Sequence, residues 1–134
     1  MRIGTLLHER ILKVPCKKRE LSPADPEEIA VENTLFGWIL HLHREQVPCE
    51  SESVARYLAA FARMGFIEVP VPKDHRIVEE VVEDLERGVE DLTKQIEEEI
   101  SGELNPSRRK QLFDLVWEGV RERLETEGAL ALAR

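Results

Sequence analysis

The chain has 134 residues, of which 34% are charged and 42% hydrophobic, a size suited to one domain with a genuine core. Aromatic residues make up only 5%, so aliphatic side chains must fill most of that core. No apolar run is as long as a membrane span or the apolar part of a signal peptide, so we expect a cytoplasmic protein with no membrane partner. Two cysteines, Cys16 and Cys49, are too few for a disulfide scaffold and fit a reducing compartment.

The net charge of −8 is unevenly distributed. Residues 1–20 hold six basic and two acidic residues, a net +4, whereas residues 74–104 hold three basic and twelve acidic residues, a net −9. Phosphate would repel this acidic segment, so a basic protein surface would suit it better as a partner. The alternative is a solvated helix face without a partner. Abundant glutamate with few amides also fits a thermophilic source, although GC-rich coding would enrich arginine in the same way.

A helix start signal lies at Asp25. Asp25 can act as the N-cap, Pro26 occupies the first helical position, and Glu28 places a carboxylate in the first turn. The apolar residues that follow fall largely on one stripe, with Trp38 near its edge. The sequence therefore predicts a helix from Asp25 to about Leu42.

A second helix is expected to begin at Ser51 or Ser53 and to end at Gly65, followed by a strand over residues 66–69. Residues 53–69 resemble the recognition helix and first wing strand of winged-helix domains. Winged-helix proteins place another short helix and a turn ahead of the recognition helix. This chain departs from that pattern, because only residues 46–50 separate the two predicted helices. The resemblance implies a DNA-binding transcriptional regulator with five candidate contact residues: Ser51, Ser53, Arg56, Tyr57 and Arg63.

Strands are expected in the first half of the chain. Residues 1–20 predict a short helix or turn followed by a strand. Val14-Pro15-Cys16 recurs as Val47-Pro48-Cys49, and residues 69–72 are similar. These segments could lie side by side in a small sheet whose edges are limited by proline, or they could recur by coincidence.

Two long amphipathic helices are predicted after residue 73. Apolar residues recur every three or four positions from Asp74, a possible cap, to Ile100. Asn105-Pro106 then repeats the cap-and-proline start signal, and the second helix should run to about Glu127. Similar lengths predict an antiparallel hairpin, in which the basic residues 108–110 would lie beside Glu97–Glu99.

The sequence therefore predicts an α+β fold, mostly α. We expect a compact helical core with a small two- or three-stranded sheet, followed by a long antiparallel helical hairpin. Residues 1–73 would form a winged-helix-like core. Residues 74–134 would form a hairpin arm packed on that core or on a partner.

Candidate chemistry is sparse. His41 and His43 would point to different faces of a helix, and no metal-binding spacing includes Cys16 or Cys49, so we predict no metal site and no cofactor. Glu79, Glu80 and Glu83 resemble the first acidic helix of magnesium-dependent nucleotide pyrophosphohydrolases, and that resemblance implies a further acid on another helix. The last helix offers only Asp114, without the accompanying substrate residues.

We therefore predict a non-enzymatic regulatory or adaptor protein that binds a larger protein assembly, for example transcription machinery. The alternatives are a winged-helix-like DNA-binding regulator and a metal-dependent pyrophosphohydrolase. The helical hairpin could also join two copies of the chain. Expected protein-binding residues are exposed aromatic anchors and acidic side chains that attract a basic partner: Trp38, Phe66, Glu83, Glu90 and Trp117.

Overall fold

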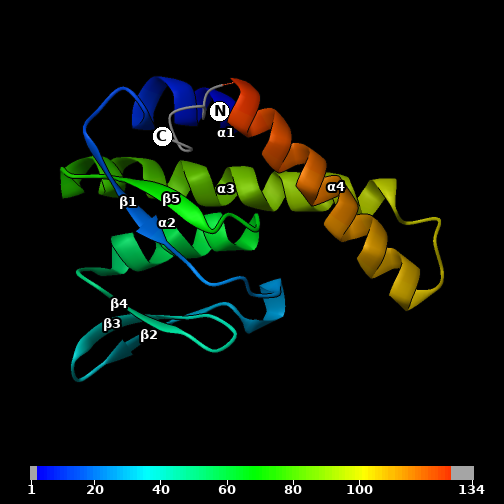
Figure 1. The fold of residues 1–134 in the computed structure, drawn as a ribbon, viewed down its shortest axis with the longest axis horizontal. Helices are drawn as coiled ribbons and strands as arrows, with labels where there is room; N and C mark the ends of the chain where they lie inside the picture. Colours follow the sequence, from blue (N-terminus) through cyan, green and yellow to red (C-terminus); the bar gives the residue numbers. More distant parts are fainter. Residues whose placement is uncertain (1–2, 128–134) are drawn as a thin grey trace.

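The computed structural model describes residues 3–127 and has the predicted α+β fold in which helices dominate (Figure 1). Antiparallel strands form two small sheets, one in the order β1-β5 and one in the order β2-β3-β4. The elements in chain order are α1 (Ile3–Leu6), the π-helix η1 (Leu7–Ile11), β1 (Cys16–Glu20), the 3₁₀ turn η2 (Pro26–Glu28), β2 (Ala30–Thr34), β3 (Gly37–His41), β4 (Gln46–Cys49), α2 (Glu52–Arg63), β5 (Glu68–Pro72), α3 (His75–Glu99) and α4 (Pro106–Glu127).

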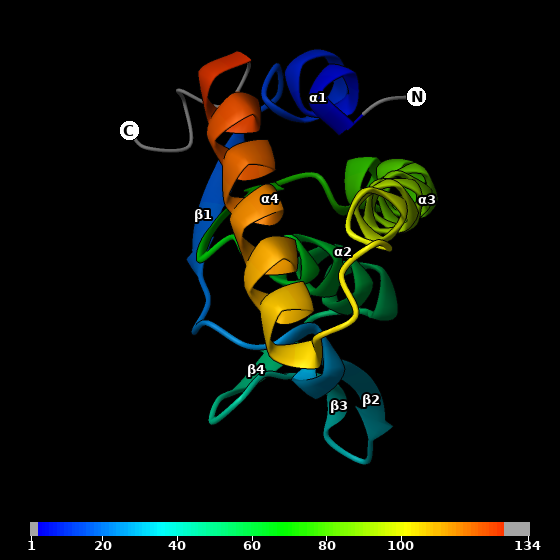
Figure 2. The ribbon, with the colours of Figure 1, turned by 90° about the vertical axis from the view of Figure 1, so that its right-hand side faces the viewer.

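The elements form layers around α2 and α3. Figures 1 and 2 show α1 on one side of α3, α2 on its other side, and the three-stranded sheet beyond α2. α4 runs along one side of these layers, from the neighbourhood of η2 towards α1. One hydrophobic cluster includes buried residues from α1, α2, α3 and α4, so the two long helices pack onto the first part of the chain.

α2 forms where the sequence predicts it. Ser51 caps its amino end, because the Ser51 hydroxyl accepts a hydrogen bond from Val54 N at 3.2 Å. The chain leaves the helix at Gly65, whose φ of +85° is readily adopted only by glycine. Residues 57–62 are all buried, because α2 lies between α3 and the three-stranded sheet.

α3 and α4 also form as predicted. Asp74 Oδ1 accepts a hydrogen bond from Arg76 N at 3.0 Å, and Asn105 Oδ1 accepts one from Ser107 N at 3.0 Å. α4 runs back towards the start of α3 but crosses it obliquely (Figure 1). The second half of α4 carries its buried side chains, namely Trp117, Val120 and Leu124.

The predicted pairing between the basic start of α4 and Glu97–Glu99 is wrong. Lys110 Nζ instead lies 3.2 Å from Asp25 Oδ2, and Arg108 Nε lies 3.8 Å from Glu103 Oε2. The first turns of α4 lie away from the end of α3 (Figure 1), and the contact of Lys110 with Asp25 brings them within reach of the start of η2.

The helix predicted from Asp25 to Leu42 is also wrong. Its start signal acts locally, since Glu28 Oε1 accepts a hydrogen bond from Asp25 N at 3.0 Å, but only the short turn η2 follows. The chain then forms the β2–β3 hairpin, in which Gly37 has a φ of +108° that no α-helix contains. Of the apolar side chains assigned to a helical stripe, Leu35 and Phe36 therefore lie in the hairpin turn, and Ile39 and Leu40 point to opposite faces of β3.

Residues 3–20 form a short helical segment and a strand, as predicted. Two of the three Val-Pro segments meet, because Cys16 pairs with Pro72 and Lys73 N donates to Pro15 O at 2.9 Å. The third, Val47-Pro48, lies in β4 of the other sheet. The three segments therefore do not share one sheet.

Candidate functional site

The β2–β3 hairpin ends in a turn that holds two apolar side chains away from the body of the protein. Thr34 fixes this turn, because its hydroxyl donates to Gly37 O at 2.8 Å and accepts from Phe36 N at 3.1 Å. Gly37 completes the turn in a backbone conformation that costs about 1–2 kcal/mol for a residue with a Cβ. Local hydrogen bonds and one glycine therefore position Leu35 and Phe36.

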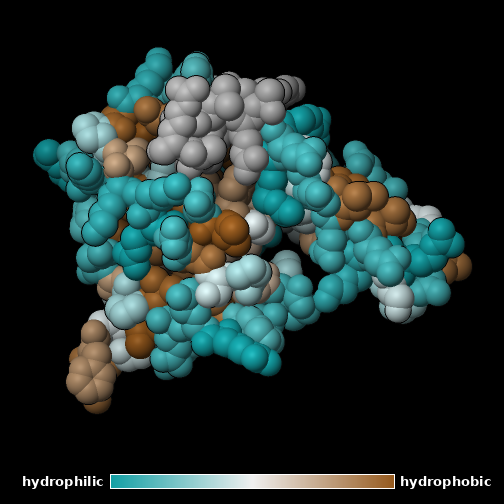
Figure 3. Space-filling view, in the orientation of Figure 1, coloured by the Kyte–Doolittle hydropathy of each residue, from teal (hydrophilic) through white to brown (hydrophobic). Residues whose placement is uncertain are grey.

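Leu35 is 99% exposed and Phe36 is 97% exposed, more than any other large hydrophobic side chain among residues 3–124. Figure 3 shows the end of the hairpin as an apolar projection from the surface. The half-buried Trp38 follows on β3, directly opposite Asn33 on β2. We call Leu35, Phe36 and Trp38 the apolar tip.

The apolar tip has the character of an interaction surface. Full burial of a leucine or phenylalanine side chain contributes about 1.5–3 kcal/mol relative to leaving it in water. Leu35 and Phe36, which are adjacent in the chain, both lack this contribution because both are exposed. Adjacent, fully exposed apolar side chains on a projection are typical of surfaces that a partner covers.

Two polar pairs hold the hairpin at its base. His41 Nε2 on β3 lies 2.6 Å from Glu32 Oε2 on β2, and His43 Nδ1 hydrogen-bonds the carboxylate of Glu28 in η2. The hydrogen bond with His43 is the main reason that the pKa of Glu28 is below its ordinary value. These pairs connect the hairpin strands to each other and to the preceding turn.

Only one of the predicted aromatic anchors lies in the apolar tip. Phe66 and Trp117 are 5% and 3% exposed, so the expectation that they are exposed anchors is wrong. Phe66 packs on Phe61, with ring centroids 5.6 Å apart, and Trp117 packs on Phe113 at 6.3 Å. Both aromatic side chains therefore help to build the core.

The predicted acidic residues do lie on the surface. Glu83 and Glu90 are both exposed on α3, and Glu90 Oε1 forms an ion pair with Lys94 Nζ at 3.2 Å. Leu35 and Phe36 are not among the predicted site residues, because the apolar spacing after Asp25 places both on the apolar stripe of the predicted helix.

The five predicted DNA-contact residues have partners or positions within the fold. Ser51 caps α2, and Ser53 is half-buried on the same helix. Arg56 Nε donates to Glu86 Oε2 on α3 at 3.1 Å. Tyr57 is fully buried, and Arg63 is half-buried beside the cavity described below. DNA binding by these residues stays a prediction.

Replacing Tyr57 by phenylalanine is expected to lower the free energy of unfolding by about 1–3 kcal/mol, because it leaves a buried carbonyl without its partner. The Tyr57 hydroxyl donates to Pro70 O at 2.5 Å, and burial raises the pKa of Tyr57 well above its ordinary value. Urea unfolding measures the change. Unchanged stability, combined with weaker retention of DNA in a gel shift, would instead assign Tyr57 to DNA contact.

The acidic residues that resemble a pyrophosphohydrolase helix do not meet a further acid. Glu79, Glu80 and Glu83 are exposed on α3, and Glu80 Oε2 lies 3.7 Å from Arg10 Nη2. Asp114 lies on α4 and lines a cavity together with residues of α2 and of the segment before η2. Within the described part of the chain, no three His, Cys, Asp or Glu side chains are grouped closely enough to hold a metal ion.

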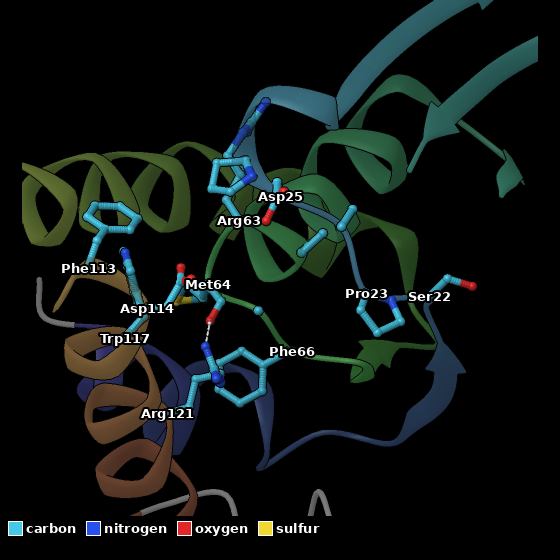
Figure 4. A pocket seen from close by; sticks show the side chains of 14 residues that line it. Ser22, Pro23, Asp25, Arg63, Met64, Phe66, Phe113, Asp114, Trp117 and Arg121 are labelled. Atoms are coloured by element: carbon cyan, nitrogen blue, oxygen red, sulfur yellow. Dashed lines mark hydrogen bonds between the residues drawn. The ribbon is translucent and has the colours of Figure 1, made fainter. Parts of the chain in front are cut away.

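That cavity, of about 230 Å³, lies between the end of α2, the segment before η2, and α4 (Figure 4). Arg121 Nη1 on α4 donates to Met64 O at the end of α2, at 2.9 Å. Trp117 also lines the cavity, and its Nε1 is a buried donor without an acceptor among the described residues. The cavity lies where α4 packs on the core. The described residues that line it include no recognisable catalytic pair.

Both cysteines are free thiols. Burial is the main cause that raises the pKa of each thiol above its ordinary value, and at Cys49 the nearby Arg19 opposes the effect. The thiolate is the reactive form. A raised pKa in the folded state also means that stability is lost as the pH rises through the folded pKa.

We therefore expect iodoacetamide to alkylate both cysteines more slowly in the folded protein than in the urea-unfolded protein at pH 8. The pH midpoint of the alkylation rate should be higher in the folded state. Mass spectrometry of the two cysteine peptides over a pH series measures both rates. The same midpoint in the folded and unfolded states would contradict the effect of burial.

α4 carries a second set of exposed apolar side chains. Leu104 is exposed just before the helix, and Leu112 and Leu115 are exposed on it. Figure 3 shows apolar surface over this helix. None of the described helices is long and apolar enough to cross a membrane.

Comparison of the chain with models of known families finds no match, and comparisons with curated proteins and with solved structures find none either.

Proposed function

We propose that this protein is a non-enzymatic regulatory or adaptor protein that binds a larger protein assembly through the apolar tip. The observation that carries the proposal is the nearly complete exposure of Leu35 and Phe36 at the end of a projecting hairpin. A few buried aromatic and aliphatic anchors usually dominate the energy of a protein interface. Transcription machinery is one assembly of the kind that such a regulator would bind.

The mechanism would be occupation of a surface on the partner. The apolar tip would enter an apolar pocket, and the half-buried Trp38 would extend the contact along β3. The acidic face of α3, including Glu83 and Glu90, would attract a basic surface and increase the rate of association more than the affinity.

Site-specific cross-linking tests the proposal. The photoreactive residue p-benzoylphenylalanine replaces Phe36 in one variant and Gln111, which is exposed on α4, in a second. In an extract of the native cell, irradiation should join the first variant to one defined protein and leave the second largely free. Equal and diffuse labelling from both positions would contradict binding through the tip.

A matched pair of surface variants adds a quantitative measurement. Leu35→Ser with Phe36→Ser removes the two fully exposed side chains of the apolar tip, and Leu104→Ser with Leu115→Ser removes two exposed apolar side chains elsewhere. The first pair should weaken binding of the cross-linked protein at least about tenfold, as expected for interface anchors. The second pair should bind that protein as the unchanged chain does.

The two other proposed partners give different results. DNA binding through α2 predicts a gel shift that weakens steeply with salt. Self-association through the exposed leucines of α4 predicts a dimer in analytical ultracentrifugation that Leu112→Ser with Leu115→Ser dissociates. Neither result requires the apolar tip.

A further inference from the structure

The free edges of the two sheets differ in how they are protected. A strand at the edge of a sheet presents unpaired N–H and C=O groups, and natural proteins usually obstruct such edges with proline or lysine. β5 contains Pro70 and Pro72, and β4 contains Pro48. β1 contains Lys17 and Lys18. Three of the four outer strands therefore carry a residue that discourages the addition of another strand.

β2 is the exception. Its five residues, Ala-Val-Glu-Asn-Thr, include neither proline nor lysine, and it lies at the end of the β2-β3-β4 sheet. Among the described residues, β2 forms backbone ladder bonds with β3 and no further backbone hydrogen bond. Ala30, Glu32 and Asn33 are exposed. The backbone of β2 is therefore accessible to a further strand.

The surroundings of this edge are acidic. Residues 21–43 contain four acidic residues, Asp25, Glu27, Glu28 and Glu32, and neither lysine nor arginine. Glu27 and Glu28 lie in η2, just before β2, and Glu32 lies at its centre. His43 pairs with Glu28, Lys110 with Asp25, and His41 with Glu32, whose side chain nevertheless stays more than half exposed. A strand that pairs with β2 would place its side chains beside Glu32 and close to the exposed Glu27. Charge complementarity then favours a basic strand.

The edge is also continuous with the apolar tip. β2 ends at Thr34, and Leu35 and Phe36 follow directly. A segment lying along β2 would therefore reach the tip at one end, where apolar side chains could contact Phe36. Backbone bonds along the edge would supply affinity, and side-chain contacts at the tip and at Glu32 would supply specificity.

We propose that β2 accepts an extended, basic segment of a partner protein as a fourth strand of the β2-β3-β4 sheet, next to the apolar tip. This inference rests on the proposed protein-binding function and specifies the mode of binding. A second copy of the chain is a poor occupant, because antiparallel pairing of two β2 strands centred on Glu32 places like charges opposite each other. Nucleic acid is also a poor occupant, since the carboxylates repel phosphate.

Two synthetic octapeptides test the proposal, one alternating lysine with valine and the other alternating glutamate with valine. Amide hydrogen exchange measured by nuclear magnetic resonance reports where each peptide binds the intact protein. The lysine peptide should slow exchange of amides within residues 30–34 and should bind at least about tenfold more tightly than the glutamate peptide. A lysine peptide with a central proline should give less protection, because proline removes a backbone donor.

Matched charge variants separate this edge from the acidic surface of α3. Glu32→Gln should weaken binding of the lysine peptide several-fold, and Glu79→Gln, which removes an exposed charge from α3, should leave it unchanged. Asn33→Lys should abolish the protection of β2, because lysine on an edge strand discourages the addition of another strand. Urea unfolding of each variant establishes that the fold is intact.

Absence of protection in residues 30–34, or stronger binding of the glutamate peptide, would overturn the strand-addition proposal. Cross-linking from position 36 to a defined protein would still support the protein-binding function in that case. Loss of both results would overturn both proposals. The two failures are therefore distinguishable.

Discussion

Replacing Phe61 by alanine is expected to lower the free energy of unfolding by about 3–5 kcal/mol. The Phe61 side chain is fully buried, and its ring centroid lies 5.0 Å from that of Tyr57 and 5.6 Å from that of Phe66. Alanine would remove these aromatic contacts and leave a cavity. α2 cannot readily move to fill it, because α3 and the three-stranded sheet hold the helix from two sides. Urea unfolding followed by circular dichroism measures the loss.

The matched control is Leu104→Ala. Leu104 is 87% exposed, so its truncation should change the free energy of unfolding by no more than about 0.5 kcal/mol. A domain of this size has a total stability of about 5–15 kcal/mol, so the milder Phe61→Leu keeps the measurement possible if the alanine variant unfolds. A loss below about 1 kcal/mol for Phe61→Ala would contradict a core centred on α2.

The helices with complete local signals could be predicted from the sequence. α2 has a serine cap and a glycine stop, and α3 and α4 begin at Asp74 and at Asn105-Pro106. These signals act over a few residues and satisfy the unpaired backbone groups at helix ends. The bounds of the three helices agree closely with the prediction.

The segment after Asp25 could not be assigned in the same way. Its start signal is genuine, but only a short 3₁₀ turn follows it. Asp25, Pro26 and Glu28 do begin a turn. Gly37 then favours a hairpin, since glycine is a poor helix former and adopts a positive φ at low cost. The prediction of a helix followed the apolar stripe and took no account of Gly37. The apolar tip was missed for that reason.

The burial of Phe66 and Trp117 depends on packing between distant segments. An apolar residue on an amphipathic helix can face the core or a partner, and its spacing in the sequence does not distinguish the two. Trp117 is buried because α4 crosses the end of α2, where Arg121 binds Met64 O. The crossing direction of α4, and with it the pairing of Lys110 with Asp25, is a property of the assembled fold.

Replacing Gly65 by alanine is expected to lower the free energy of unfolding by about 2–3 kcal/mol, from two separate costs. A φ of +85° costs about 1–2 kcal/mol for a residue with a Cβ. The new methyl group would also collide with the guanidinium of Arg121, which would have to leave Met64 O. Loss of that hydrogen bond adds about 1 kcal/mol. Urea unfolding measures the total.

Gly37→Ala separates these two costs. Gly37 has a φ of +108°, but an added Cβ there meets no atom within 4 Å, so only the conformational cost of about 1–2 kcal/mol applies. In an Arg121→Ala background, Gly65→Ala should cost no more than Gly37→Ala does, because the collision is removed. If both glycine variants cost the same in the unchanged chain, Arg121 does not fix α4 to the end of α2. A larger cost at Gly65 that disappears with Arg121 therefore measures how strongly this contact holds α4 on the core.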